Sequence, residues 1–254
     1  MIDIAYTQQC GKDPDQQDAL WCGARVFQER NLPVESHKIE NNGPLIVAVA
    51  DGVANSPMPH KASRMILKLL ADEVSQGALL TTPTIRKIHG RLCDALAKGR
   101  TFGSSTTIAA VSCLDDRCVA VSVGDSRIYR IDAQGVWQQI SRDHTILNAM
   151  IDRGEADSHT EYASFYGMLD ACLIADDEAT DFSVCRVDTP FLPGDSILVC
   201  TDGVHDTLGK ENLESLTKLP IDPSAQVGIW RKAILKLGAP DNFSMVLVRH
   251  VRFV

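Results

Sequence analysis

Two strand-like runs of this chain end in Asp-Gly. The first is "VAVADGVA", with Asp51 and Gly52, and the second is "ILVCTDGVHD", with Asp202 and Gly203. A carboxylate at a strand end is exposed at the rim of a sheet, and the glycine after it lets the backbone approach a ligand closely. Asp-Gly after a single strand is most often an ordinary turn. A chemical role therefore depends on further carboxylates in similar settings.

Three more aspartates have such settings. Asp125 lies in "VSVGDSR", Asp241 precedes the last strand in "GAPDNFSM", and Asp18 precedes an expected strand in "DPDQQDALWCG". Hard cations such as Mg²⁺ and Mn²⁺ prefer carboxylate and carbonyl oxygens together with water. Five strand-end aspartates without a His/Cys cluster are the donors that such a site requires. Spacing alone does not establish that they meet.

The elements that must position these acids can be read from the apolar pattern. Helical spacing predicts helices at about 59–76, 85–99 and 227–237. Short apolar runs predict strands at "PLIVAVADG", "STTIAAVSCL", "RCVAVSVGDS", "RIYRID", "VWQQI", "FSVCRV", "DSILVCTDG" and "NFSMVLVRHV". Helix pairs separate the strand blocks, and hairpin turns join neighbouring strands. This order favours antiparallel sheets with helices packed outside, in one domain spanning 1–254.

Composition excludes several classes of protein. The chain has 254 residues, a net charge of −8 and 44% hydrophobic residues. An acidic balance without clustered Lys and Arg excludes a nucleic-acid partner. We expect no secretion signal and no membrane span, because no apolar run reaches the length that either needs. The eight cysteines form no CxxC pair and are interpreted as buried free thiols, which predicts a cytoplasmic location.

Taken together and in order, seven strings resemble the metal-dependent Ser/Thr protein phosphatases of the PPM (type 2C) family, bacterial type. They are "DQQDAL", "VAVADGVA", "FGSSTTIAAV", "AVSVGDSRIYRI", "ISRDHT", "PFLPGDSILVCTDGVHD" and "APDNFSMVLV". The resemblance covers nearly the whole chain. It implies an α+β fold, a four-layer α-β-β-α sandwich of two antiparallel sheets flanked by helix pairs.

The resemblance also implies roles for the acids. Asp51 would bridge two Mn²⁺ or Mg²⁺ ions, and the Gly52 carbonyl would ligate one of them. Asp202 and Asp241 would hold the other ion, and Asp18 would support metal-bound water. The two bridged cations would lower the pKa of a shared water, and the resulting hydroxide would attack the phosphorus of phosphoserine or phosphothreonine.

Further expectations follow from the same resemblance. Asp125 matches the position that helps to bind a third, weaker ion in bacterial members. The substrate would be a phosphorylated protein, the phosphatase would oppose a Ser/Thr kinase, and a monomer is expected. No protein nucleophile is needed, so Cys200, in an apolar run, is interpreted as core packing.

The phosphate-binding position departs from the family pattern. The family carries an arginine where this chain has Asp13. Lys12 beside it is a candidate for binding the substrate phosphate, although as a point charge rather than a planar fork; the alternative is a solvated lysine. Weaker phosphate binding is expected, and with it a raised KM.

The segment at about 144–180 corresponds to the family's variable flap. It is polar and weakly periodic, and we expect a helix followed by loop. It either tunes substrate access or is a solvated surface loop. Two other interpretations of function remain open at this point. One is a catalytically weakened family member that acts as a regulatory phosphoprotein-binding module, and the other is a phosphatase for a small metabolite.

Overall fold

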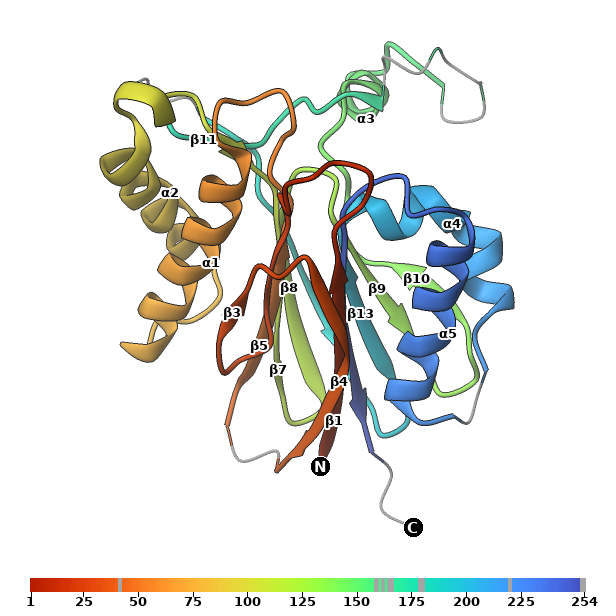
Figure 1. Ribbon diagram of the computed structural model, residues 1–254. Helices are drawn as coiled ribbons and strands as arrows, with labels where there is room; N and C mark the ends of the chain where they lie inside the picture. Colours follow the sequence, from red (N-terminus) through yellow and green to blue (C-terminus); the bar gives the residue numbers. More distant parts are fainter. Residues whose placement is uncertain are drawn as a thin grey trace.

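Two six-stranded antiparallel sheets face each other in the computed structural model (Figure 1), which describes residues 1–40, 43–157, 160, 163, 167–177, 181–218 and 221–251. Sheet A has the order β10-β9-β13-β14-β1-β4 and comprises β1 (Ile2–Gln9), β4 (Asn31–Ile39), β9 (Arg127–Ile131), β10 (Trp137–Gln139), β13 (Ser196–Cys200) and β14 (Phe243–His250). Sheet B has the order β12-β8-β7-β5-β2-β3 and comprises β2 (Ala19–Trp21), β3 (Val26–Phe27), β5 (Leu45–Ala50), β7 (Ile108–Leu114), β8 (Arg117–Val123) and β12 (Cys185–Pro190). The short strands β6 (Ser105–Thr106) and β11 (Leu173–Ile174) pair with each other.

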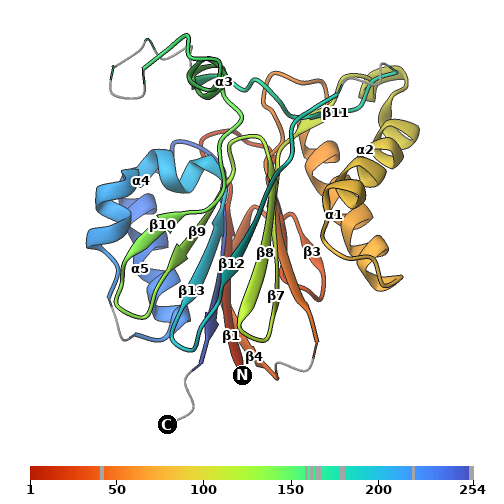
Figure 2. The ribbon, with the colours of Figure 1, turned by 180° about the vertical axis from the view of Figure 1, so that it is seen from behind.

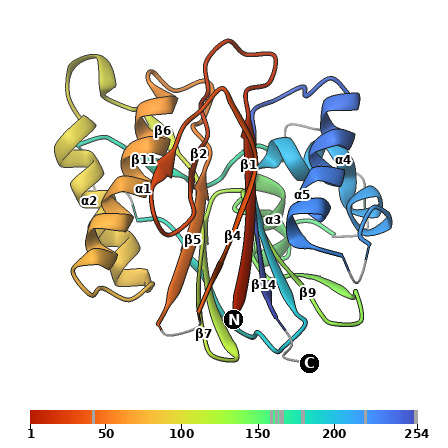
Figure 3. The ribbon, with the colours of Figure 1, turned by 60° about the horizontal axis from the view of Figure 1, so that its bottom comes forward.

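Helix pairs cover the outer face of each sheet. Helices α1 (Pro59–Ser75) and α2 (Thr82–Leu96) pack on sheet B, whereas α4 (Asp202–Ser215) and α5 (Pro223–Lys236) pack on sheet A (Figures 1 and 3). The predicted four-layer α-β-β-α sandwich is therefore confirmed. The helix α4 was not predicted.

The end of the molecule opposite the two termini carries α3 (Ile146–Asp152) above the sheets (Figure 2). This helix and β11 are the described elements of the predicted flap, at about 144–180. A helix was expected there. Residues 158–159, 161–162, 164–166 and 178–180 of that segment lie outside the described residues.

The central strands β5, β13 and β14 are buried on both faces, which is why they appear in the sequence as largely apolar runs. In β5, Val47 and Val49 enter the core between the sheets, while Ile46, Ala48 and Ala50 pack against α1 and α2. Strands β13 and β14 alternate in the same way between the inter-sheet core and the helices of sheet A. Burying each large apolar side chain contributes about 1.5–3 kcal/mol.

One expectation about the cysteines is wrong. Cys113 and Cys118 form a disulfide across the β7–β8 hairpin, where they are directly opposite each other. Two facing positions of a tight hairpin bring thiols close enough to bond, and the spacing in sequence did not reveal this pairing. The other six cysteines are free. Among the described residues, no helix is both long and apolar enough to cross a membrane.

Candidate metal centre

The strand register brings the five predicted aspartates to one end of the two sheets. Ala19 of β2 pairs with Ala50 of β5, so Asp18 and Asp51 are the next residues on neighbouring strands. In sheet A, Cys200 pairs with Met245, so the segments that carry the other acids continue past the same end. Asp202 follows β13, Asp241 precedes β14, and Asp125 lies in the turn between β8 and β9.

Asp51 occupies the centre of this group. Its backbone is fixed because its N–H donates to Thr107 Oγ1 (3.0 Å) and its carbonyl accepts from Thr107 N (2.8 Å). Burial, followed by the charges of Asp18 and Asp202 and a hydrogen bond with the Asp202 carboxyl, raises the pKa of Asp51 well above its usual range. Neighbouring acids disfavour the charged form of this carboxyl. A cation bound beside it would strongly favour that charged form.

Asp18 is fully buried and oriented by two hydroxyl groups. Its Oδ2 accepts from Thr201 Oγ1 (2.9 Å) and from Ser244 Oγ (2.8 Å). Burial and the Asp202 charge raise the pKa of Asp18 to about 7, although the two hydroxyl hydrogen bonds lower it. Its other oxygen, Oδ1, is buried and has no hydrogen-bond partner.

Asp125 and Asp241 both lie near enough to Asp202 for its charge to act on them. Burial and the Asp202 charge raise the pKa of Asp125 to about 7, while nearby His205 lowers it. Burial and the Asp202 charge also raise the pKa of Asp241, against a hydrogen bond from the Asn242 backbone. A hollow of 220 Å³ opens to solvent beside them and is lined by Asp202, Gly203, Asp206, Thr207, Pro240 and Asp241.

A steric constraint explains why each of the two aspartates is followed by glycine, and the sequence alone did not reveal it. A Cβ on Gly52 would lie 2.5 Å from the carbonyl oxygen of Pro59, at the start of α1. A Cβ on Gly203 would lie 1.9 Å from the carbonyl oxygen of Asn242. At both positions the missing side chain therefore makes room for another backbone segment. The second Asp-Gly is also no turn, because Asp202 begins the helix α4.

The donor set fits a hard divalent cation in its chemistry. All the converging side chains are carboxylates, and two buried oxygens, Asp18 Oδ1 and Asp202 Oδ1, have no partner. Across the described residues, however, no group of three or more His, Cys, Asp or Glu side chains is arranged so that it could hold a metal ion. Mg²⁺ commonly binds through only one or two carboxylates and keeps several waters, so an open group of acids meets its requirements.

The predicted phosphate-binding residue lies on the loop between β1 and β2. Lys12 is exposed there, directly after Gly11, whose N–H donates to Asn242 Oδ1 (2.9 Å) next to Asp241. Asp13 is also exposed, and its carboxylate accepts from Asp15 N (2.9 Å) and Gln17 Nε2 (3.1 Å). The loop therefore brings one lysine and one opposing acid to the rim of the group.

Three residues at the site were not predicted. Thr201 and Ser244 orient Asp18, and buried His205 contacts the Asp125 carbonyl. All three lie within the seven strings quoted above. Their roles at the site could have been predicted from one feature only, their position one to three residues from a strand-end aspartate in a mainly apolar segment. Cys200 is fully buried and packs in the core, as predicted, and burial raises the pKa of its thiol.

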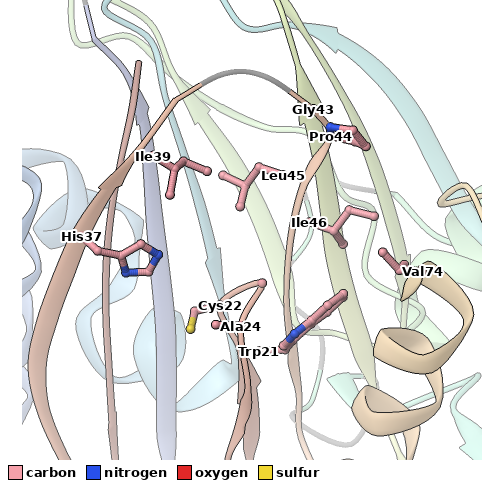
Figure 4. Close-up of a pocket in the computed structure, with 11 residues that line it drawn as sticks. Trp21, Cys22, Ala24, His37, Ile39, Gly43, Pro44, Leu45, Ile46 and Val74 are labelled. Atoms are coloured by element: carbon pink, nitrogen blue, oxygen red, sulfur yellow. The ribbon is translucent and has the colours of Figure 1, made fainter. Parts of the chain in front are cut away.

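A second hollow lies away from the acids. It measures 350 Å³ and is lined mainly by apolar residues of β2, β4, β5 and the end of α1, including Trp21, Ile46 and Val74 (Figure 4). Its described lining contains no carboxylate. Val74 is close to the end of α1, whereas the Asp51–Gly52 corner packs against Pro59 at its start. This hollow therefore contributes no acid to the metal centre.

Comparison with known proteins agrees with this architecture. The family model described as Protein phosphatase 2C matches residues 34–233. The serine/threonine phosphatase stp of Listeria monocytogenes (serotype 4b, strain F2365) is 26% identical over 88% of this chain and 90% of its own length. The serine/threonine protein phosphatase PstP of Mycobacterium tuberculosis is 26% identical over 81% of this chain and 40% of its own length.

Solved structures share the fold. The Mycobacterium tuberculosis phosphatase PstP/Ppp superimposes with a TM-score of 0.77 at 20% identity, covering 99% of this chain and all of that one. A PstP catalytic domain in complex with two manganese ions superimposes with a TM-score of 0.74 at 19% identity, with coverage of 99% and 100%. At these identities the likeness establishes the fold.

The fold and the family match together define an enzyme class, the protein phosphatases. Because the family model spans most of the chain, the chain belongs to the protein phosphatase 2C family. The resemblance predicted from the seven strings is confirmed. Asp51, Asp125 and Asp202 lie inside the matched range, whereas Asp18 and Asp241 lie outside it.

Proposed function

We propose that this chain is a metal-dependent phosphatase that hydrolyses phosphoserine and phosphothreonine in proteins. The observation that carries the proposal is that five aspartates from segments far apart in sequence lie at one end of the two sheets. The Listeria and Mycobacterium relatives are serine/threonine phosphatases, which supports the substrate class. The PstP domain with two manganese ions supports Mn²⁺ as a cofactor, and Mg²⁺ has the same donor preference.

In this proposal Asp51 and the Gly52 carbonyl would hold one ion, and Asp202 and Asp241 would hold the second together with Asp51. Ions of this kind lower the pKa of a bound water and neutralise charge on phosphoryl oxygens. Side chains of this protein would orient the Asp18 carboxylate toward such a water. Asp18 keeps Oδ2 occupied by two hydroxyl groups, which leaves Oδ1 directed for a hydrogen bond from water.

Few cationic groups of this chain are available to bind the substrate phosphate in this proposal. Lys12 binds the substrate phosphate in our proposal, and the neighbouring Asp13 opposes it, so binding is weak and KM is high. The residues 1–254 act as one phosphatase domain, with the segment at about 144–180 as the flap beside the site. The partners are phosphoproteins and the Ser/Thr kinase that phosphorylates them.

One observation favours a second candidate. Asp13 occupies the position of a phosphate-binding cation, so a catalytically weakened module that binds phosphoproteins is the alternative. Against it, five acids are kept at one rim, where burial and then the charges of neighbouring acids raise the pKa values of Asp18, Asp51, Asp125 and Asp241. A single-turnover assay with enzyme in excess separates the two, because a binding module releases no phosphate.

The test of the proposed function is hydrolysis of a phosphothreonine peptide after treatment with EDTA. We expect activity to disappear with the chelator and to return with Mn²⁺. Asp51→Asn is expected to lower kcat by about a thousandfold or more, with the fold intact by circular dichroism. The matched control is Asp94→Asn, an exposed aspartate on α2, which should retain full activity. Full activity in Asp51→Asn, or activity indifferent to EDTA, contradicts the proposal.

A further inference from the structure

A buried imidazole lies directly beside the metal centre. His205 is 3% exposed and belongs to the first turns of α4, three residues after Asp202. Residues three apart on a helix share a face, so His205 and Asp202 face the same neighbouring loop. Burying a polar ring without hydrogen bonds is costly, and the partners of this ring therefore indicate its role.

Both ring nitrogens of His205 have partners. Nδ1 lies 2.9 Å from Oδ1 of Asp206, whose carboxylate is exposed to solvent. Nε2 lies 3.2 Å from the carbonyl oxygen of Asp125, an acceptor, so the ring donates there. The imidazole thus connects the helix that carries Asp202 to the backbone of Asp125.

The other contacts of the Asp125 turn hold its neighbours rather than Asp125 itself. Gly124, with φ of +100°, packs against Thr107, and its carbonyl accepts from His144 N (2.9 Å). Ser126 Oγ lies 2.8 Å from Thr107 Oγ1. These contacts join the turn to β6, β7 and the flap segment. His205 joins it to α4.

We infer that His205 is a positioning residue that holds the Asp125 carboxylate opposite Asp202. The inference rests on the proposed function, extended by the third, weaker ion that the family resemblance implies at Asp125. Asp202, whose charge acts on Asp125, would share in holding that ion. Side chains that orient metal ligands without touching the ion typically change metal affinity 10- to 100-fold when they are replaced. His205 therefore sets the affinity of this third site, although it is no ligand of it.

Two substitutions separate the two bonds of the ring. In His205→Gln the amide nitrogen stands near the former Nε2 and can still donate to the Asp125 carbonyl. In His205→Asn the amide nitrogen stands near the former Nδ1, so the bond to Asp206 can be kept while the bond to Asp125 is lost. The two variants have the same polar group and differ in whether it can donate to the Asp125 carbonyl.

The matched control is His250→Gln at the opposite end of the molecule. His250 is also buried, and its Nδ1 lies 2.8 Å from the Phe191 carbonyl oxygen. A Gln there loses that bond, because its amide nitrogen replaces Nε2 rather than Nδ1. The control therefore removes one buried histidine–carbonyl hydrogen bond far from the acids.

The experiment combines Mn²⁺ titration by calorimetry with hydrogen exchange of the Asp125 and Ser126 amides in metal-free protein. His205→Asn is expected to weaken the weakest Mn²⁺ site about tenfold or more and to speed exchange about five- to tenfold, while His205→Gln stays within about threefold of the wild type in both. His250→Gln should change neither the Mn²⁺ affinity nor the exchange rate.

If His205→Asn matches His250→Gln in both measurements, the inference is overturned. A wild-type chain that binds no Mn²⁺ contradicts the proposed function, and the exchange rates then decide separately whether His205 holds the turn.

Discussion

The hydroxyl of Thr201 donates a 2.9 Å hydrogen bond to Oδ2 of Asp18, 183 residues earlier in the chain. Thr201 directly follows β13 of sheet A, and Asp18 directly precedes β2 of sheet B, so this bond joins the ends of the two sheets. Ser244 of β14 donates to the same oxygen at 2.8 Å. The sandwich therefore does more than place acids at one rim, because it also orients one of them.

The Ser244 hydroxyl should be required for this orientation. Ser244→Ala leaves the buried Asp18 oxygen with one donor fewer, and we expect a loss of about 1–3 kcal/mol in the free energy of unfolding together with Mn²⁺ affinity about tenfold weaker. The control is Ser122→Ala on β8, a buried serine whose hydroxyl has no hydrogen-bond partner. It should be neutral or slightly stabilising. Urea unfolding and Mn²⁺ titration measure both effects, and equal results for the two variants would contradict the role given to Ser244.

The carboxyl group of Asp18 should make the metal-free protein less stable as the pH rises. Its pKa is about 7 in the folded chain and about 4 when unfolded. The folded state therefore holds the proton more tightly, and the stability that this proton gives is lost between about pH 4 and pH 7. Asp18→Asn cannot lose a proton there. In EDTA, we expect its stability relative to the wild type to increase by at least about 1 kcal/mol from pH 5 to pH 8.

Urea unfolding at the two pH values tests this. The comparison with Asp18→Asn removes the contribution of titrating groups that do not interact with Asp18. A difference between the two proteins that stays constant with pH would show that Asp18 is already ionised in the metal-free fold, and the electrostatic description of the site would be wrong.

The glycine of the second Asp-Gly pair should be irreplaceable for steric reasons. In Gly203→Ala the new Cβ would lie 1.9 Å from the Asn242 carbonyl oxygen, so the helix start or the segment before β14 must move. We expect a loss of about 1–3 kcal/mol or more, read from the thermal midpoint. Gly90→Ala in α2 is the control, because nothing lies within 4 Å of the added atom. It should stabilise the helix by about 0.5–1 kcal/mol, and a destabilisation shared by both variants would argue against the steric explanation.

The charge of residue 13 should govern substrate binding. Asp13→Arg places a cation that can bind phosphate with two hydrogen bonds where an opposing acid now stands, and we expect KM for a phosphothreonine peptide to fall about tenfold with little change in kcat. Lys12→Ala should raise KM if Lys12 binds the phosphate. Steady-state kinetics distinguish the outcomes. An unchanged KM in Lys12→Ala would mean that this lysine is merely solvated.

Much of this architecture could be predicted because the signal was local. Helix α1 is long and has apolar residues at helical spacing, strand β5 is apolar throughout, and each strand-end aspartate follows or precedes a strand. What could not be predicted depends on tertiary contacts. Strand β1 buries Thr7 and Gln8, which look like solvent-facing residues until Leu32 and Ser244 supply their partners.

Helix α4 escaped prediction for a related reason. Its sequence has a weak apolar face, and Gly209 interrupts it with φ of +72°. The orienting roles of Thr201, Ser244 and His205 were hidden as well, since a hydroxyl or an imidazole acquires such a role only when two distant segments meet. The disulfide between Cys113 and Cys118 likewise depends on the facing positions in a hairpin.

The most direct test of the account is an anomalous difference map from crystals soaked in Mn²⁺. The account predicts at least two manganese peaks within coordinating distance of the Asp51 and Asp202 carboxylates, and their loss in crystals of Asp51→Asn. Manganese bound elsewhere on the surface, or no peak among these acids, would contradict it.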